Sequence, residues 1–373
     1  MSNQSSSPDA SRRLAPWLQI QLESLLAQRG HAWLLGGPSG LGQFELALAL
    51  ATAWLCEQPT AQGACGHCGS CHAVQVHTHA DLCMLLPETL SLALGWPLDE
   101  KTQDELDSKK RKPSKEIKVD AAREAVSFTQ FTRSRGTTKV VLVFPAERMN
   151  HITANTLLKT LEEPPGAVKF ILATEAAHQL LPTIRSRCLG HTMVWPDFEQ
   201  ALIWLGSETA RKNGAEGSLK KPLHSPEAAD LKTLLLGAGG RPADALTWAQ
   251  NSPAADAAAH WKALPKAMAR GDVSALTDWA PATAVDALQK ICHDMWAVRV
   301  GASPRFFSAK DLPALASGKP GCAPQNSPGA GLHALASWSR DLNAIARTVE
   351  HPYNPGLLIE SLVSRAKTAL SAR

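Results

Sequence analysis

Four of the chain's eight cysteines have the spacing of a metal site. Cys56 is followed by eight residues and then by Cys65, Cys68 and Cys71, in a C-x-x-C-x-x-C pattern. Four thiolates can close a tetrahedral zinc site with no open position for a reacting water, so such an ion would be structural. The sequence therefore predicts a structural zinc that pins the end of one helix, at Cys56, to the loop that follows it.

Other interpretations of these cysteines stay open. An iron–sulfur cluster with ferredoxin spacing would need a cysteine at position 75, where the chain has Gln75. A histidine could replace Cys56 as a ligand, and the nearby candidates are His67, His72, His77 and His79. The thiols could also be free, as buried cysteines often are. A disulfide framework is not expected, because the chain shows no export signal.

A glycine-rich loop follows soon after an apolar run near the start of the chain. A working phosphate-binding loop reads G-x-x-x-x-G-K-[ST], in which the lysine contacts the β- and γ-phosphates and the hydroxyl binds magnesium. Here Gly37, Gly40 and Gly42 are kept, but Gln43 and Phe44 occupy the lysine and hydroxyl positions. Glutamine is neutral and phenylalanine cannot ligate a hard cation.

The second magnesium element is also incomplete. Residues 139–144 (KVVLVF) predict a buried strand, which in an active enzyme would end in an Asp-Glu pair that holds magnesium and activates water. This chain has Phe144 and Pro145 at that point, and Glu147 comes two residues late. The sequence therefore predicts a nucleotide-binding fold that does not hydrolyse ATP.

The segments that must position these residues alternate between strands and helices up to residue 195. Apolar runs typical of buried strands occur at residues 31–35, 139–144, 169–174 and 189–195. Helical patterns occur at residues 17–29, 44–55, from 119 onward, 152–163 and, in a short form, from Pro182. This alternation indicates an α/β domain with a mostly parallel sheet and helices on both faces.

The remainder of the chain is predicted to be helical. We expect a disordered tail at residues 1–13, the α/β domain at 14–195, a small helical lid domain at 196–251 and a C-terminal helical domain at 252–373. Within the α/β domain, residues 56–71 would form the zinc module. Residues 88–118 show little periodicity and carry the basic run KKRKPSK, so they predict a flexible insertion.

Composition narrows the class of protein without identifying it. Apolar residues make up 44% of the chain and charged residues 19%, which predicts a globular protein rather than a disordered one. The net charge of +4 is compatible with nucleic acid nearby, but it is too weak to establish such a partner. The longest apolar run, residues 46–56, is roughly half of what a bilayer requires, so a cytoplasmic protein is expected.

Residues 155–188 carry the most specific resemblance. NTLLKTLEEPP, at residues 155–165, resembles a segment of the bacterial DNA polymerase III clamp-loader subunits, which are AAA+ proteins. IRSRC, at residues 184–188, is similar to the SRC motif of that family, and the cysteine-rich insertion is similar as well. The likeness covers residues 14–195 well. It continues weakly through GRPADAL at residues 240–246, and beyond residue 250 only helical character supports it.

The resemblance implies a type of subunit and a role for Arg187. Active members of the family keep the loop lysine and the strand-end carboxylates, so the changes at residues 43, 44, 144 and 145 favour the non-hydrolysing, delta-prime type over gamma/tau. By resemblance, Arg187 would reach the γ-phosphate of ATP held by an adjacent gamma/tau subunit, as an arginine finger in trans. Without that resemblance, an ordinary arginine paired with a carboxylate would be the simpler interpretation.

The resemblance also implies partners. These would be the gamma/tau and delta subunits and, through the assembled clamp loader, the sliding clamp and primed DNA at the nucleoid-associated replication machinery. Residues 252–373 would form the oligomerising collar. The chain by itself would not be an enzyme, although it would belong to a DNA-directed DNA polymerase holoenzyme. Two other functions stay open: a catalytically active gamma/tau-like ATPase, and a zinc-dependent DNA-binding adaptor.

Overall fold

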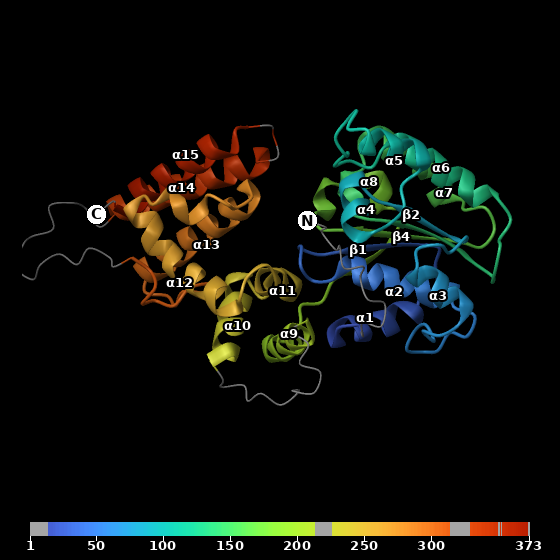
Figure 1. The fold of residues 1–373 in the computed structure, drawn as a ribbon, viewed down its shortest axis with the longest axis horizontal. Helices are drawn as coiled ribbons and strands as arrows, with labels where there is room; N and C mark the ends of the chain where they lie inside the picture. The colour runs from blue at the N-terminus through green and yellow to red at the C-terminus, as the bar shows by residue number, and fades with distance from the viewer. Residues whose placement is uncertain (1–13, 213–225, 314–328, 350, 352, 372–373) are drawn as a thin grey trace, which may run out of the picture. The chain divides into compact units, whose positions relative to one another are not determined.

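The computed structural model describes residues 14–212, 226–313, 329–349, 351 and 353–371 (Figure 1). The chain divides into two compact units, Met1–Pro196 and Asp197–Arg373. The predicted tail at residues 1–13 lies outside the described residues. The boundary expected near residue 251, between a lid and a collar, stays a prediction.

The first unit is built on one five-stranded sheet in which every pairing is parallel. The strands, in the spatial order β2-β3-β4-β1-β5, are β1 (Ala32–Gly36), β2 (Leu82–Leu85), β3 (Lys139–Val143), β4 (Val168–Thr174) and β5 (Leu189–Thr192). The parallel α/β sheet predicted from the sequence is confirmed. Strand β2 was not predicted, because its four residues (LCML) are too few to show a pattern.

Within residues 14–196, eight α-helices accompany this sheet, and two short 3-10 turns, η1 (Ala146–Arg148) and η2 (Ala177–Gln179), follow β3 and β4. The helices are α1 (Pro16–Leu26), α2 (Gln43–Leu55), α3 (Gly69–Gln75), α4 (Glu88–Leu94), α5 (Glu100–Asp107), α6 (Val119–Gln130), α7 (His151–Glu162) and α8 (Pro182–Arg185). Figure 1 shows α1–α3 on one face of the sheet and α4–α8 on the other. The sheet is therefore covered on both faces, as its continuous apolar strands require.

Helix α7 has a defined start and a defined stop. The side chain of Asn150 accepts a hydrogen bond from the backbone N–H of Thr153 at 2.9 Å, which caps the first turn. Leu157 and Leu161 are fully buried in the core beneath β3 and β4. The helix ends before Pro164, because proline disfavours a helical conformation in the residue that precedes it. The end of the helix therefore fixes the backbone position of Glu162, which lies in its last turn.

Residues 88–118 are more regular than their sequence indicated. They contain α4 and α5, and a buried glutamate at the start of α4 ties the segment together. The Glu88 carboxylate accepts hydrogen bonds from Arg111 Nη2 at 3.0 Å and from the backbone N–H of Ser114 at 2.8 Å, and it pairs with Lys118 at 2.6 Å. Arg111, from the middle of the basic run, is thus engaged inside the chain. The flexibility of the insertion stays a prediction.

Substitution of Glu88 by glutamine is expected to destabilise this insertion. Burial alone would raise the pKa of Glu88, but the donors from Arg111, Lys118 and Ser114 outweigh it and lower the pKa to about 2. Because the pKa falls on folding, the stabilisation is complete above pH ~4.5 and is lost as the pH falls toward 2. Such a shift corresponds to about 3 kcal/mol. Thermal unfolding at pH 7 should show a lower Tm for Glu88→Gln, with the difference shrinking near pH 3, whereas the exposed Glu116→Gln control should match the wild type.

All the regular secondary structure in the described residues of the second unit is helical. Its helices are α9 (Phe198–Lys212), α10 (Pro226–Gly237), α11 (Pro242–Asn251), α12 (Ala254–Arg270), α13 (Pro281–Arg299), α14 (Gly329–Thr348) and α15 (Pro355–Ser371), with the 3-10 turn η3 (Val273–Leu276) after α12. One apolar cluster joins α9–α11, a larger one joins α12–α15, and Trp248 packs against both. Among the described residues, no helix is long and apolar enough to cross a membrane.

Candidate functional site

The glycine-rich loop is closed by one of its own side chains. The loop runs from β1 to α2, and Gly40 and Gly42 adopt positive φ angles of 77° and 95°. The buried amide of Gln43 donates to the carbonyl oxygen of Gly37 at 2.7 Å and to that of Pro38 at 2.6 Å. A lysine at this position would extend toward a phosphate, whereas Gln43 holds two loop carbonyls.

Two aromatic rings lie where magnesium ligands would be needed. Phe44, in the first turn of α2, and Phe144, at the end of β3, have ring centroids 5.3 Å apart, with a tilt of 39° between the planes. A tilted pair at this separation is a favourable aromatic contact. These rings offer no oxygen ligand for a hard cation.

The carboxylate that follows β3 is bound to the neighbouring strand. Glu147 accepts a hydrogen bond from the hydroxyl of Thr174 at 2.6 Å and another from the backbone N–H of Glu175 at 3.0 Å. These contacts join η1 to the end of β4. Glu147 is therefore engaged in holding two strand ends together.

Arg187 lies in the turn between α8 and β5, and its side chain is 30% exposed. Its Nη1 donates to the carbonyl oxygen of Thr183 at 3.0 Å, and its Nη2 donates to Oε1 of Glu162 at 3.1 Å. Glu162 is itself 57% exposed. Within this chain, Arg187 thus has the carboxylate partner of the ordinary interpretation, and its side chain is still partly exposed.

Arg187 and the glycine-rich loop lie at opposite ends of the parallel strands. β5 runs parallel to β1, with Trp33 opposite Leu189 and Gly36 opposite Thr192. Arg187 precedes the amino end of β5, whereas the loop follows the carboxyl end of β1. The paired length of three residue steps alone separates them by about 10 Å. Arg187 cannot serve the loop of its own chain across that distance.

The four cysteines meet in one cluster. Cys56 follows the end of α2, Cys65 lies in the intervening loop, and Cys68 and Cys71 begin α3. Their sulfur atoms all lie within 4.8 Å of one another, with 3.8 Å between Cys56 and Cys68 and 3.9 Å between Cys65 and Cys71. A tetrahedral ion with metal–sulfur distances of ~2.3 Å has sulfur–sulfur edges of ~3.8 Å. The cluster could therefore hold a metal ion.

Backbone N–H groups point at the sulfur atoms of this cluster. Cys56 Sγ accepts from Gln58 at 3.4 Å and from Cys65 at 3.3 Å, and Cys68 Sγ accepts from Cys71 at 3.4 Å. Burial raises the pKa of Cys56 and of Cys71. Burial would also raise the pKa of Cys68, but N–H donors and neighbouring thiols bring it to about 6. Donors of this kind favour thiolates, the form that binds metal.

The structure corrects one detail of the predicted metal site. The sequence analysis placed the last three cysteines in the loop that follows Cys56, whereas Cys71 is in the first turn of α3, a helix that was not predicted. The side chain of Glu57 accepts from the backbone N–H and the hydroxyl of Ser70, both at 2.9 Å, and so secures the start of that helix. The motif G-S-C-H-A-V-Q gives little helical periodicity over seven residues, which explains the omission.

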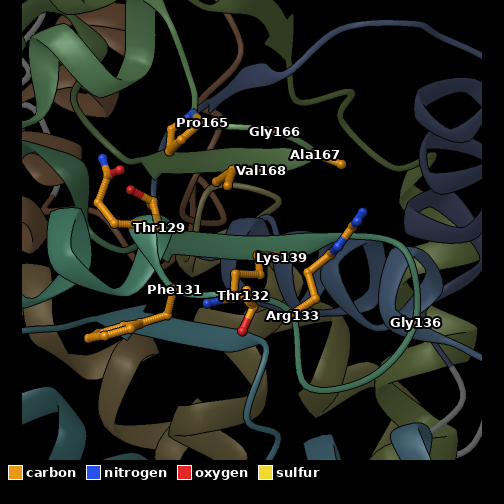
Figure 2. A pocket seen from close by; sticks show the side chains of 11 residues that line it. Thr129, Phe131, Thr132, Arg133, Gly136, Lys139, Pro165, Gly166, Ala167 and Val168 are labelled. Carbon is orange, nitrogen blue, oxygen red and sulfur yellow. The ribbon is translucent and has the colours of Figure 1, made fainter.

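Sequence reasoning also missed a cavity of about 530 Å³ at the amino ends of β3 and β4. The cavity is lined by residues 129–133, 136 and 139 and by residues 165–168, and Figure 2 labels Phe131 and Lys139 among them. The buried carboxylate of Asp81 accepts from the backbone N–H groups of Ser134 and Arg135 and so fixes the loop on the rim. The cavity and the glycine-rich loop therefore lie at opposite ends of the strands.

Comparison with known proteins places this arrangement in a family. A family profile described as "DNA polymerase III, delta subunit" matches residues 17–193. The chain is 33% identical over 286 residues to DNA polymerase III subunit delta' of Escherichia coli, a match that covers 74% of this chain and 77% of that relative. The chain belongs to the delta-prime family of DNA polymerase III subunits.

Other relatives match about half of this delta-prime family member. DNA polymerase III subunit delta' of Pseudomonas aeruginosa is 38% identical over 192 residues, which span 51% of this chain and about half (52%) of that relative. DNA polymerase III subunit tau of E. coli is 32% identical over 170 residues, or 46% of this chain and 22% of that relative. The family and the strand order confirm the AAA+ fold inferred from the motifs.

Proposed function

We propose that this delta-prime family member is a non-hydrolysing subunit of the clamp loader that places the sliding clamp on primed DNA. One contrast carries the proposal. The amide of Gln43 binds two carbonyl oxygens of the chain's own phosphate loop. A partly exposed arginine, Arg187, is nevertheless present at the opposite end of the strands. A subunit of this kind would contribute to a neighbour's ATP site and have none of its own.

The loss of ATP hydrolysis follows from three separate positions. Gln43 supplies no charge for the phosphates, the Phe44–Phe144 pair supplies no oxygen for magnesium, and Glu147 is bound to Thr174. Restoring the catalytic residue at one of these positions would leave the other two requirements for hydrolysis unfulfilled. These contacts also weigh against the alternative of an active gamma/tau-like ATPase.

Arg187 would act in trans as an arginine finger. The guanidinium carries five N–H donors, and each Nη uses one in the contacts to Thr183 and Glu162. Among the described residues no contact uses the second N–H of either Nη, which leaves two donors for oxygens of a γ-phosphate. A permanently charged planar group suits this role. Its distance from the chain's own loop favours a site on an adjacent subunit, which we propose is gamma/tau.

The metal of the cysteine cluster would be zinc. Four sulfur ligands in a tetrahedral arrangement, without a histidine or an open position, are typical of a structural zinc site. When bound, the ion would supply fixed geometry rather than catalysis. The four cysteines around it would then join the end of α2 to the start of α3. The zinc-dependent DNA-binding adaptor is not favoured, because residues 56–71 of the zinc module contain no lysine or arginine to contact phosphates.

Family membership supports our proposal for the remaining partners. We propose gamma/tau on one side and delta on the other, with the helices after residue 252 as the oligomerising collar. Contacts with the sliding clamp and primed DNA would come through the assembled complex. The protein would work in the cytoplasm, with the nucleoid-associated replication machinery.

Reconstitution of the complex with gamma/tau and delta subunits tests this proposal. Arg187→Ala should assemble normally by gel filtration, because Arg187 is not in a core. Single-turnover hydrolysis should show one fraction of bound ATP turning over at least about tenfold more slowly, a loss of ~1.4 kcal/mol of transition-state stabilisation. The exposed neighbour Arg185→Ala is the matched control. Unchanged hydrolysis in an assembled Arg187→Ala complex would overturn the finger.

A further inference from the structure

We propose that Glu162 is the positioning residue for Arg187, holding the guanidinium in the orientation that a neighbour's ATP requires. This inference rests on the proposed function of Arg187. The two side chains come from segments 25 residues apart, and Glu162 Oε1 accepts from Arg187 Nη2 at 3.1 Å. Taken separately, the LEEPP and SRC motifs do not indicate that these two side chains interact. The contact appears only in the folded structure.

The backbone on both sides of the pair is fixed by one core. Leu161, which precedes Glu162, and Ile184, in the short helix before Arg187, are both fully buried in the apolar cluster beneath the sheet. Cys188, which follows Arg187, packs against the same cluster. The separation of the two side chains is therefore set by the fold, and only their rotamers remain to be chosen.

The contacts made by Arg187 select one rotamer. Its Nη1 is held by the carbonyl oxygen of Thr183 at 3.0 Å, and its Nη2 by Glu162. Its Nε is buried, with no partner among the described residues. Two acceptors on the two terminal nitrogens fix both the position and the plane of the guanidinium. Without Glu162, Thr183 alone would leave that plane free to rotate.

A carboxylate beside the finger has two opposed effects. It holds the arginine in one rotamer, so the side chain loses less rotamer entropy when it contacts ATP. It also offsets part of the positive charge that the phosphate needs. Because Glu162 is 57% exposed, water screens the charge effect, while the hydrogen bond still sets the geometry. We therefore expect ordering to outweigh neutralisation.

Glu162→Ala and Glu162→Gln, measured in the reconstituted complex, separate these effects. Exposed ion pairs have small energies, so Glu162→Ala should slow single-turnover hydrolysis about two- to fivefold, with the apparent KM for ATP unchanged. Glu162→Gln keeps an acceptor oxygen without the charge, and it should recover part of that loss. Glu163→Gln, the adjacent exposed carboxylate of the same motif, should behave as the wild type.

The double variant Glu162→Ala/Arg187→Ala distinguishes this inference from the proposed function. If Glu162 acts through Arg187, the double variant should turn over ATP as slowly as Arg187→Ala alone. Slow hydrolysis by Arg187→Ala together with unchanged or faster hydrolysis by Glu162→Ala would overturn the positioning role and leave the finger intact. Glu162→Gln no better than Glu162→Ala would also overturn it. Unchanged hydrolysis by Arg187→Ala would overturn both.

Discussion

Cys71→Ser is expected to destabilise the first unit by at least about 3 kcal/mol and to weaken the binding of the proposed zinc. Cys71 is buried and begins α3, so its loss opens the tetrahedral cluster on the side of that helix. The remaining three sulfurs could still bind an ion, but a serine oxygen is a poor substitute for a thiolate. The Tm of the full chain should fall by roughly 6–12 °C for a unit of this size.

Metal content and unfolding have to change together for this expectation to hold. The wild type should carry one zinc per chain by atomic absorption, and a strong chelator should lower its Tm to that of Cys71→Ser. Cys83→Ser is the matched control: Cys83 lies on β2 outside the cluster, and burial raises its pKa to about 12. Iron with visible absorbance would favour the iron–sulfur alternative. An equal Tm with and without metal would contradict a structural role.

The parts of the fold that the sequence revealed are those with long, uninterrupted patterns. The run KVVLVF has no polar residue after its lysine, so it could only be a strand covered on both faces, and β3 is buried at every position. Pro164 marks the end of α7 for the same kind of reason, since it acts on its immediate neighbour, whereas the cap at Asn150 was not predicted and the helix was expected to begin at residue 152. Helix α3 and strand β2 are too short to accumulate such a pattern.

The candidate site was predictable in its residue types but not in its contacts. The absence of lysine at position 43 is visible in the sequence, whereas the hydrogen bonds from Gln43 to two loop carbonyls depend on the turn of the loop. The pair of Arg187 with Glu162 depends on α7 and α8 meeting in one core. Contacts between distant segments follow from packing, and no local spacing encodes them.

The second unit contains a buried carboxylate that no sequence pattern indicated. Asp294, in α13, is fully buried and accepts from the backbone N–H groups of Arg305, Phe306 and Phe307 at 2.9, 2.8 and 2.8 Å. The loop held in this way places the ring of Phe307 on Trp261, with centroids 4.6 Å apart and planes within 7°. Asp294 thus fixes a loop that completes the apolar cluster of α12–α15.

Asp294→Ala is expected to destabilise the second unit by about 3–5 kcal/mol. The substitution leaves three backbone N–H groups without their acceptor, and each unsatisfied buried donor costs about 1–3 kcal/mol before water enters the loop. Denaturant unfolding followed by tryptophan fluorescence should report the loss, since Trp261 lies against Phe307. Asp278→Ala, at an exposed aspartate of the same unit, is the matched control.

The same variant separates assembly from catalysis. If the helices after residue 252 form the collar, Asp294→Ala should reduce the amount of complex recovered with gamma/tau and delta by gel filtration, although Arg187 is intact. Arg187→Ala should do the reverse, with normal assembly and slow hydrolysis. Normal recovery of an Asp294→Ala complex, despite a destabilised second unit, would mean that assembly depends on other surfaces of the chain.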